Sequence, residues 1–298
     1  MGRDARGAGC GVLCRRLPAR PVNYRHAFHA GNFADCMKHA LLVWLLHALR
    51  RKEAPFAVLD THAGRGEYDL SAPEAERTGE WRQGIGRLLG LTAEEGPLAD
   101  YVALARALGA PARYPGSPAL VRALLRPQDR LICVELHSED HAALAARFRG
   151  DRQVAVHRRD GWEALRALTP PPERRGLVLM DPPFEQEGEF DRLAEAIALL
   201  RRRFRAGILA AWYPIKHRAP VRAFHAALAA GEARDLIAAE LWLREPTDPT
   251  RLNGCGLLVA NAPFRFAEEC GPMLAALLAA LGARGSGEGW AVTRIVEE

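Results

Sequence analysis

The tetrapeptide Asp181-Pro182-Pro183-Phe184 carries the clearest chemical signal in the sequence. It offers one carboxylate, a stiff backbone with a free carbonyl, and one aromatic face. These groups suit a planar base with an exocyclic amine, because Asp181 and the Pro182 carbonyl would accept the amine hydrogens while Phe184 stacks on the ring. A strand that simply ends in a turn is the plainer interpretation, so the surrounding sequence has to support the chemical one.

The residues before Asp181 form the apolar run Leu177-Val178-Leu179-Met180. Such a run is typical of a strand that is buried on both faces inside a parallel sheet. Because two prolines cannot donate to a neighbouring strand, the strand must stop at Asp181. Open α/β sheets bind their ligands at the carboxyl ends of strands, so the sequence predicts a ligand site at this point.

Acidic residues also end three earlier predicted strands, over 55–60, 130–135 and 154–160; these residues are Asp60, Glu135 and Asp160. A Gly-x-Gly turn (Gly64 and Gly66) follows the first strand, and D-x-x-x-G-x-G is the pattern of S-adenosyl-L-methionine (S-adenosylmethionine) binding. Glu135 is placed to accept both ribose hydroxyls of an adenosine. Taken singly, Asp60 and Asp160 are equally well explained as helix caps or solvated loop acids. The four acidic strand ends together predict an S-adenosylmethionine site.

The elements that would position these residues alternate between strand and helix. We therefore predict an α/β, Rossmann-like fold with a mixed seven-stranded sheet and a small helical insertion. Two late strands, over 236–243 and 256–261, should form an antiparallel hairpin, and 290–296 is a candidate edge strand. Ser117 is a candidate cap for a helix over 119–125.

The predicted domain organisation has two parts. Residues 1–20 lack periodicity and are rich in Gly and Arg, so we expect a disordered tail or an over-called start. Residues 21–298 would form one domain, interrupted at about 70–113 by two or three helices. A helix is also expected over 33–51, where Lys38 and His39, judged alone, would be solvated helix residues.

Composition narrows the class of protein. The chain has 298 residues and a formal net charge of +5, which permits a polyanionic partner without requiring one. Its six cysteines form neither a C-x-x-C pair nor a zinc-ligand pattern, so we expect free thiols, no metal and a reducing cytoplasm. Neither a secretory signal nor a membrane span is expected, and we expect a soluble cytoplasmic monomer.

Several longer motifs identify a resemblance. The chain resembles the RlmJ-type bacterial 23S rRNA adenine-N6 methyltransferases from about residue 24 to residue 296. The motifs that carry it are Tyr24-Arg25-His26-x-Phe28-His29-Ala30-Gly31-Asn32-x-Ala34-Asp35, Lys38-His39, Leu59-Asp60-Thr61-His62-Ala63-Gly64, Glu76-Arg77-Thr78-Gly79-Glu80, Tyr114-Pro115-Gly116-Ser117-Pro118, Glu135-Leu136-His137 and Asp181-Pro182-Pro183-Phe184. Phe184 stands where the family often has Tyr, which keeps the stacking and loses a phenolic hydrogen bond.

The resemblance implies that residues 21–298 form a Rossmann-like class I S-adenosylmethionine-dependent methyltransferase domain, and it implies the roles of particular residues. It implies methyl transfer to adenine 2030 of 23S rRNA, with Asp181 as the catalytic carboxylate and Tyr24 in contact with the substrate. It implies that the cofactor touches Lys38, His39, His62, Ser117, Glu135, Asp160, Gly161 and Asp181. Arg25, His26, Arg65 and Lys216 are candidate phosphate or base contacts, although a solvated surface charge is the better interpretation for each except Arg25.

Two alternatives remain open at this point. Related tetrapeptides serve DNA adenine and protein-glutamine methyltransferases, although an enzyme acting on DNA would be expected to carry a larger recognition domain. A non-catalytic RNA-binding assembly factor on the same fold is the other alternative, and the intact tetrapeptide Asp181-Pro182-Pro183-Phe184 argues against it.

Overall fold

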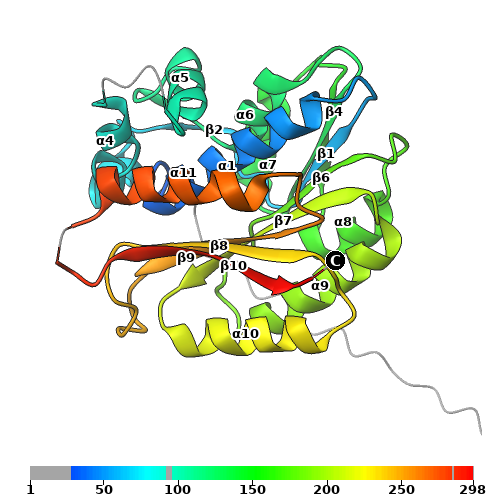
Figure 1. The fold of residues 1–298 in the computed structure, drawn as a ribbon. Coiled ribbons are helices and arrows are strands. Elements are labelled where there is room, and N and C mark those ends of the chain that lie inside the picture. The colour runs from blue at the N-terminus through cyan, green and yellow to red at the C-terminus, as the bar shows by residue number, and fades with distance from the viewer. Residues whose placement is uncertain (1–27, 92–95, 284, 298) are drawn as a thin grey trace, which may run out of the picture.

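The computed structural model describes residues 28–91, 96–283 and 285–297. The predicted tail (1–20) and the predicted substrate contacts Tyr24 and Arg25 lie outside these ranges, as does His26. Figure 1 shows a central sheet with helices on both faces, which is the predicted α/β layering. The chain elements therefore follow the Rossmann-like plan that alternating strands and helices predict.

The central sheet has eight strands in the order β10-β8-β9-β7-β6-β1-β4-β5. From β7 to β5 the strands are parallel, whereas β9 is antiparallel to both β7 and β8, and β10 is antiparallel to β8. The strands are β1 (Ala57–Asp60), β4 (Arg130–Glu135), β5 (Val154–Arg158), β6 (Gly176–Met180), β7 (Gly207–Ile215), β8 (Leu236–Trp242), β9 (Gly254–Ala260) and β10 (Gly289–Val296). The predicted hairpin of β8 and β9 is confirmed, and the predicted count of seven strands is wrong because the candidate edge strand β10 does pair with β8.

Each face of the sheet buries its own apolar cluster, because successive side chains along a strand point to opposite faces. One cluster packs under α1 (Phe33–Arg50), α6 (Ser117–Leu124), α7 (Ser138–Arg147) and α11 (Phe266–Leu281). The other packs under α8 (Gly161–Leu168), α9 (Glu189–Arg203) and α10 (Arg218–Ala230). Because both faces of the sheet are covered by apolar side chains, polar groups can gather only at the two ends of the strands.

Helix α1 is buried on nearly all sides, because it lies between the sheet and the insertion and also contacts α11. Asn32 caps it, since the side-chain oxygen of Asn32 accepts hydrogen bonds from the amides of Ala34 and Asp35. The first turns of α1, which carry Lys38 and His39, are therefore held inside the molecule. An isolated amphipathic pattern could not predict this arrangement.

The described residues of the insertion form four short helices, whereas the sequence predicted two or three: α2 (Pro73–Thr78), α3 (Glu80–Gln83), α4 (Ile85–Leu89) and α5 (Ala99–Ala107). They lie between two short strands, β2 (Glu67–Asp69) and β3 (Arg113–Pro115), which pair antiparallel. Neither strand is among the elements that the sequence predicts. Three-residue strands that pair across more than forty residues leave no local periodic signal.

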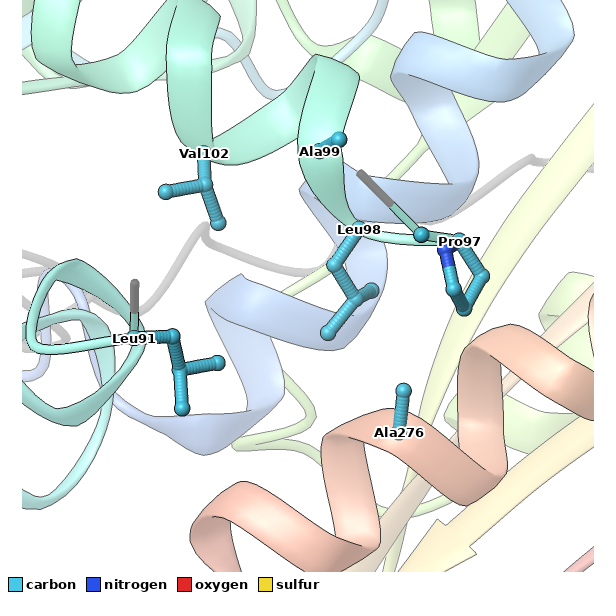
Figure 2. A pocket seen from close by; sticks show the side chains of 7 residues that line it. Leu91, Pro97, Leu98, Ala99, Val102 and Ala276 are labelled. Carbon is cyan, nitrogen blue, oxygen red and sulfur yellow. The ribbon is translucent and has the colours of Figure 1, made fainter. Parts of the chain in front are cut away.

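An apolar pocket lies between the insertion and α11 (Figure 2). Its lining residues are Leu91, Gly96, Pro97, Leu98, Ala99, Val102 and Ala276. Because none of these side chains is polar, the pocket shares no chemistry with the predicted site. Among the helices that the structure describes, none combines the length and apolar character that crossing a membrane requires.

Candidate functional site

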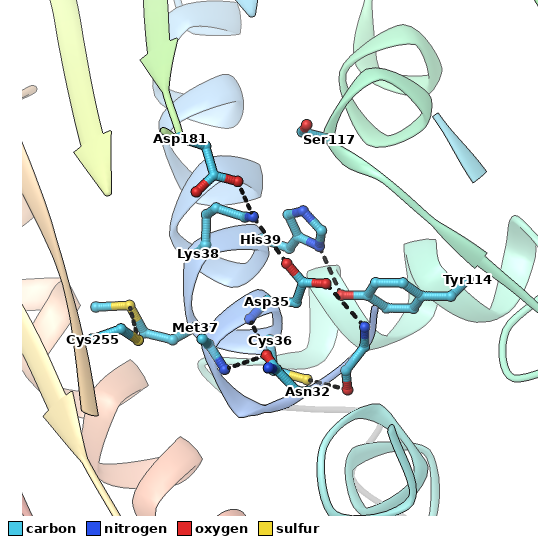
Figure 3. Close-up of polar contacts among 12 residues, drawn as sticks. Asn32, Asp35, Cys36, Met37, Lys38, His39, Tyr114, Ser117, Asp181 and Cys255 are labelled. Atoms are coloured by element: carbon cyan, nitrogen blue, oxygen red, sulfur yellow. Dashed lines mark hydrogen bonds and ion pairs between the residues drawn. The ribbon is translucent and has the colours of Figure 1, made fainter. Parts of the chain in front are cut away.

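The catalytic candidate Asp181 directly follows β6, at the carboxyl edge of the sheet. The Nζ atom of Lys38, on α1, lies 2.5 Å from Asp181 Oδ2 and 2.9 Å from Asp35 Oδ1 (Figure 3). Lys38 and Asp35 are buried, whereas the Asp181 side chain keeps 18% of its surface exposed. One buried ammonium thus bridges a buried carboxylate and a partly open one.

The interpretation of Lys38 and His39 as solvated helix residues is wrong, because both are buried. Burial alone would lower the pKa of Lys38, but the carboxylates of Asp181 and Asp35 outweigh that effect and hold the pKa well above its ordinary value. His39 Nδ1 lies 2.7 Å from the hydroxyl of Tyr114, which lies 3.0 Å from that of Tyr101. These contacts fix α1 to the insertion and its flanking strand.

Asp60, at the end of β1, is fully buried. Ser117 Oγ donates to Asp60 Oδ2 at 2.6 Å, and the amide of His62 lies 3.3 Å from Oδ1. Burial raises the pKa of Asp60 to about 6, despite the lowering effect of the Ser117 hydrogen bond. The prediction that Ser117 caps a helix is wrong, since Gly116 occupies the cap position of α6 and the hydroxyl of Ser117 turns to Asp60 instead.

Glu135, at the end of β4, is hydrogen-bonded to the turn that follows β1. Its Oε2 accepts a hydrogen bond from the amide of Gly64 at 2.8 Å, and its Oε1 accepts one from the amide of His137 at 2.7 Å. Gly64 has a φ of 59°, in the left-handed region that favours glycine. Each carboxylate oxygen keeps a second acceptor position, and burial raises the pKa of Glu135.

The loop after β1 also touches the start of α8. A Cβ on Gly161 would lie 2.4 Å from the Thr61 carbonyl oxygen and 2.9 Å from the His62 ring, so this position needs glycine. Asp160 caps α8 by accepting from the amides of Trp162 and Glu163, which confirms the helix-cap alternative. Burial lowers the pKa of His62 to about 4, so its ring is neutral at neutral pH.

Phe184 extends the site toward the antiparallel half of the sheet. Its φ of 51° lies in the left-handed region, which is unusual for an aromatic residue. Its ring meets the rings of Phe190 and Trp212 edge-on, at centroid distances of 4.9 and 6.0 Å. Met180 at the end of β6 pairs with Ala211, so β7 continues beyond β6 from Trp212 onward and flanks the tetrapeptide.

The structure brings the described candidates to one edge of the sheet. They come from α1, α6, α8 and the segments that follow β1, β4 and β6. These candidates are Asp181, Lys38, His39, His62, Ser117, Glu135, Asp160, Gly161, Pro182 and Phe184. Of the weaker candidates, Arg65 pairs with Asp140 at 3.2 Å, and Lys216 is exposed just after β7. Sequence reasoning missed Asp35 as a partner of Lys38, although their i, i+3 spacing on a predicted helix was a usable signal.

Comparisons with known proteins agree with this geometry. The family described as "Ribosomal RNA large subunit methyltransferase D, RlmJ" matches residues 53–295. "Ribosomal RNA large subunit methyltransferase J" of Haemophilus influenzae is 38% identical over 281 residues, which cover 93% of this chain and 100% of the relative. The protein of the same name from Escherichia coli is 36% identical over 269 residues, covering 89% of this chain and 96% of the relative. A crystal structure of a Legionella pneumophila protein is similar with a TM-score of 0.80 and 32% identity, and covers 89% of this chain and 98% of that one.

Proposed function

Since the chain belongs to the RlmJ family of ribosomal RNA large subunit methyltransferases, we propose that it transfers a methyl group from S-adenosylmethionine to the N6 amine of an adenine in 23S rRNA. By the resemblance, that adenine is the one at position 2030. The reaction would take place in the cytoplasm, in a monomer whose methyltransferase domain spans residues 21–298.

The free acceptor capacity of Asp181 is the observation that carries the proposal. Lys38 occupies Oδ2, whereas Oδ1 accepts no hydrogen bond from any residue that the structure describes. Pro182 and Pro183 have no amide hydrogens to compete for that oxygen. An amine that reaches Asp181 therefore meets an open carboxylate oxygen, with the ring of Phe184 three residues away.

The residues at the ends of β1 and β4 fit S-adenosylmethionine. The remaining acceptor positions on Glu135 suit the two ribose hydroxyls, and the exposed side chain of Leu136 beside it offers an apolar surface to the adenine. Gly161 lets the loop after β1 pack against the start of α8, and the neutral ring of His62 adds no positive charge next to a sulfonium. Lys38, His39, Ser117 and Asp160 surround the same edge.

The chemistry assigned to the protein is positioning and charge stabilisation. The cofactor supplies an electrophilic methyl group on a sulfonium, so the new C–N bond forms as the C–S bond breaks. Asp181 and the Pro182 carbonyl hold the two amine hydrogens, which aims the nitrogen lone pair at the methyl group. The positive charge that develops on N6 is stabilised by Asp181, which then accepts the proton and passes it to solvent.

An adenine inside a duplex cannot reach Asp181 at the end of β6. The target base must be unpaired or flipped out of its stack before Phe184 can contact it. Trp212, where β7 continues beyond β6, meets the Phe184 ring edge-on and adds a second aromatic ring beside the tetrapeptide. No observation favours DNA or protein as the substrate, so these remain outcomes of the test.

The test is tritium transfer from labelled S-adenosylmethionine. Unmodified 23S rRNA, its fragments, duplex DNA and protein are compared side by side, with the Asp181→Ala variant as the control. We expect label in one adenine of the rRNA, and none with the variant even though it still binds the cofactor. Label in DNA or protein, or an unchanged rate in the variant, would overturn the proposal.

A further inference from the structure

The motif Glu76-Arg77-Thr78-Gly79-Glu80 has no part in the chemistry described so far, yet it contacts the stretch that leads into α1. Thr78 Oγ1 donates a hydrogen bond to the carbonyl of Phe28. The guanidinium of Arg77 lies 6.0 Å from the centre of the Phe28 ring. The insertion therefore holds the chain just before α1 through a motif that the sequence already marks as distinctive.

Glu80 makes the central contact between the motif and this stretch. Its two carboxylate oxygens lie 3.1 and 3.0 Å from His29 Nδ1, and its Oε2 also accepts from Asn32 Nδ2 at 3.0 Å. His29 and Asn32 flank the turn at Gly31. One carboxylate thus holds both sides of the turn from which α1 starts.

The backbones of the two segments are also in direct contact. The amide of Ile85 donates to the carbonyl of Gly31 at 2.8 Å. A Cβ on Gly84 would lie 2.1 Å from that same carbonyl oxygen, so no side chain fits there. Gly31 itself has a φ of 75°. The contact is therefore specific to this pair of glycines rather than an incidental approach of two loops.

Polar contacts continue from Glu80 through Asn32 to the catalytic candidate, and Figure 3 shows the part of this chain of contacts from Asn32 to Asp181. Asn32 Oδ1 accepts from the amide of Asp35 at 3.0 Å, and Asp35 Oδ2 accepts from the amide of Gly31 at 2.9 Å. The other oxygen of Asp35 holds Lys38, which holds Asp181. A shift at the start of α1 would therefore move Lys38 relative to Asp181.

We propose that Glu80 is a positioning residue for methyl transfer: by holding Asn32 and His29, it fixes the start of α1 and keeps Lys38 aligned with Asp181. The inference rests on the proposed function for its activity readout. Glu80 touches neither Lys38 nor Asp181 and acts through Asn32 and Asp35.

The test compares three variants of the full-length protein. Glu80→Ala removes both contacts, and we expect it to lower the single-turnover rate of methyl transfer about tenfold at saturating RNA and cofactor. Glu80→Gln retains an oxygen that can accept from Asn32 and should recover most of that rate. Glu76→Ala removes another glutamate of the same motif, one whose ion pair with Arg82 does not touch residues 28–32, and it should keep the wild-type rate.

A second measurement needs no RNA. Amide hydrogen exchange over residues 31–38 should quicken in Glu80→Ala and stay unchanged in Glu76→Ala. A wild-type rate in Glu80→Ala would overturn the inference. So would equal loss of activity and of melting temperature in Glu80→Ala and Glu80→Gln, since this would indicate a general structural role. An inactive wild-type protein would overturn the proposed function instead, and the exchange result would still decide whether Glu80 holds the start of α1.

Discussion

Two carboxylates flank strands of the same sheet at opposite ends, one just before its strand begins and the other just after its strand ends, and their surroundings differ. Asp129, just before β4, is fully buried and accepts four hydrogen bonds, three from Arg126 and one from the amide of Phe56. Asp181, just after β6, accepts only from Lys38 among the described residues and stays partly exposed. The carboxylate of Asp129 is thus saturated with donors, whereas that of Asp181 has one oxygen without a donor among the described residues.

The aromatic residues beside the two carboxylates differ in the same way. Phe56 is buried, and the guanidinium groups of Arg126 and Arg175 lie 5.5 and 5.8 Å from its ring centre. Phe184 meets its aromatic neighbours edge-on and is only partly buried. The polar and aromatic groups at the Asp129 end of the strands are occupied by other residues of the protein. Those at the Asp181 end still have an oxygen atom and a ring face that a ligand can contact. Four substitutions test this comparison.

The largest effect is expected at the open carboxylate. Asp181→Asn keeps the size of the side chain but removes the negative charge that stabilises the developing ammonium. We expect single-turnover methyl transfer to fall about a thousandfold, with cofactor affinity only modestly weakened. Rapid-quench measurements at saturating cofactor, together with calorimetric binding, would check this. If the variant fails to fold, Asp181 is structural and the comparison collapses.

The saturated carboxylate should show the opposite pattern. Asp129→Asn removes the charge that pairs with the partly buried guanidinium of Arg126 and puts an amide donor where a fully buried oxygen accepts hydrogen bonds, so we expect the free energy of unfolding to drop by about 3 kcal/mol. The rate of methyl transfer per folded molecule should not change. Urea unfolding followed by circular dichroism measures the first quantity, and active-site titration before the assay controls for the second. A loss of catalysis without a loss of stability in Asp129→Asn would contradict the proposed difference between Asp129 and Asp181.

Asp60 lies between these extremes, because it is buried with only two donors. Its folded pKa of about 6 exceeds the value of about 3.9 for an unfolded Asp, so its contribution to stability is present below pH 4 and lost as the pH rises through 6. Asp60→Asn does not titrate, and its stability relative to wild type should rise by about 3 kcal/mol between pH 4 and pH 7. Urea unfolding across this range gives both curves, and parallel curves would contradict the assignment.

The smallest effect is expected at the partly open ring. Phe184→Leu removes the stacking surface, which is worth about 1–3 kcal/mol per base, so kcat/KM for RNA should fall about tenfold. Cofactor affinity and melting temperature should change little, and Phe184→Tyr should retain the wild-type kcat/KM. Steady-state kinetics with RNA as the varied substrate would measure the effect. An equal loss of cofactor affinity would place Phe184 outside the base-binding role.

Much of the fold could be predicted because its signals are local. The apolar run before Asp181, the acidic strand ends and the Gly-x-Gly turn each depend on adjacent residues, and the strands lie where these patterns indicate. The burial of Lys38 and His39 could not be predicted, since it depends on the insertion covering a face of α1 from far along the chain. Ser117 looked like a helix cap for the same reason: its actual partner, Asp60, is 57 residues away.

The surroundings of the predicted cofactor contacts follow from the sequence more directly than the surroundings of Phe184. Glycine and carboxylate positions at strand ends follow from backbone geometry and leave a recognisable spacing. The surroundings of Phe184 depend on how its ring turns and on how far β7 extends past β6, and both are set by packing between distant elements. Tyr24 and Arg25 lie outside the described residues, so their substrate contacts stay predictions.

The pairing of β2 with β3 has a consequence for how this protein family can vary. Asp69 and Arg113 are opposite each other in the β2–β3 pair, so the first and last residues of the insertion lie side by side. Lengthening a segment whose ends are already joined costs little additional loop-closure entropy. Evolution can therefore add or remove residues between these two strands while the sheet and its catalytic edge stay in register, and length differences among relatives should concentrate there.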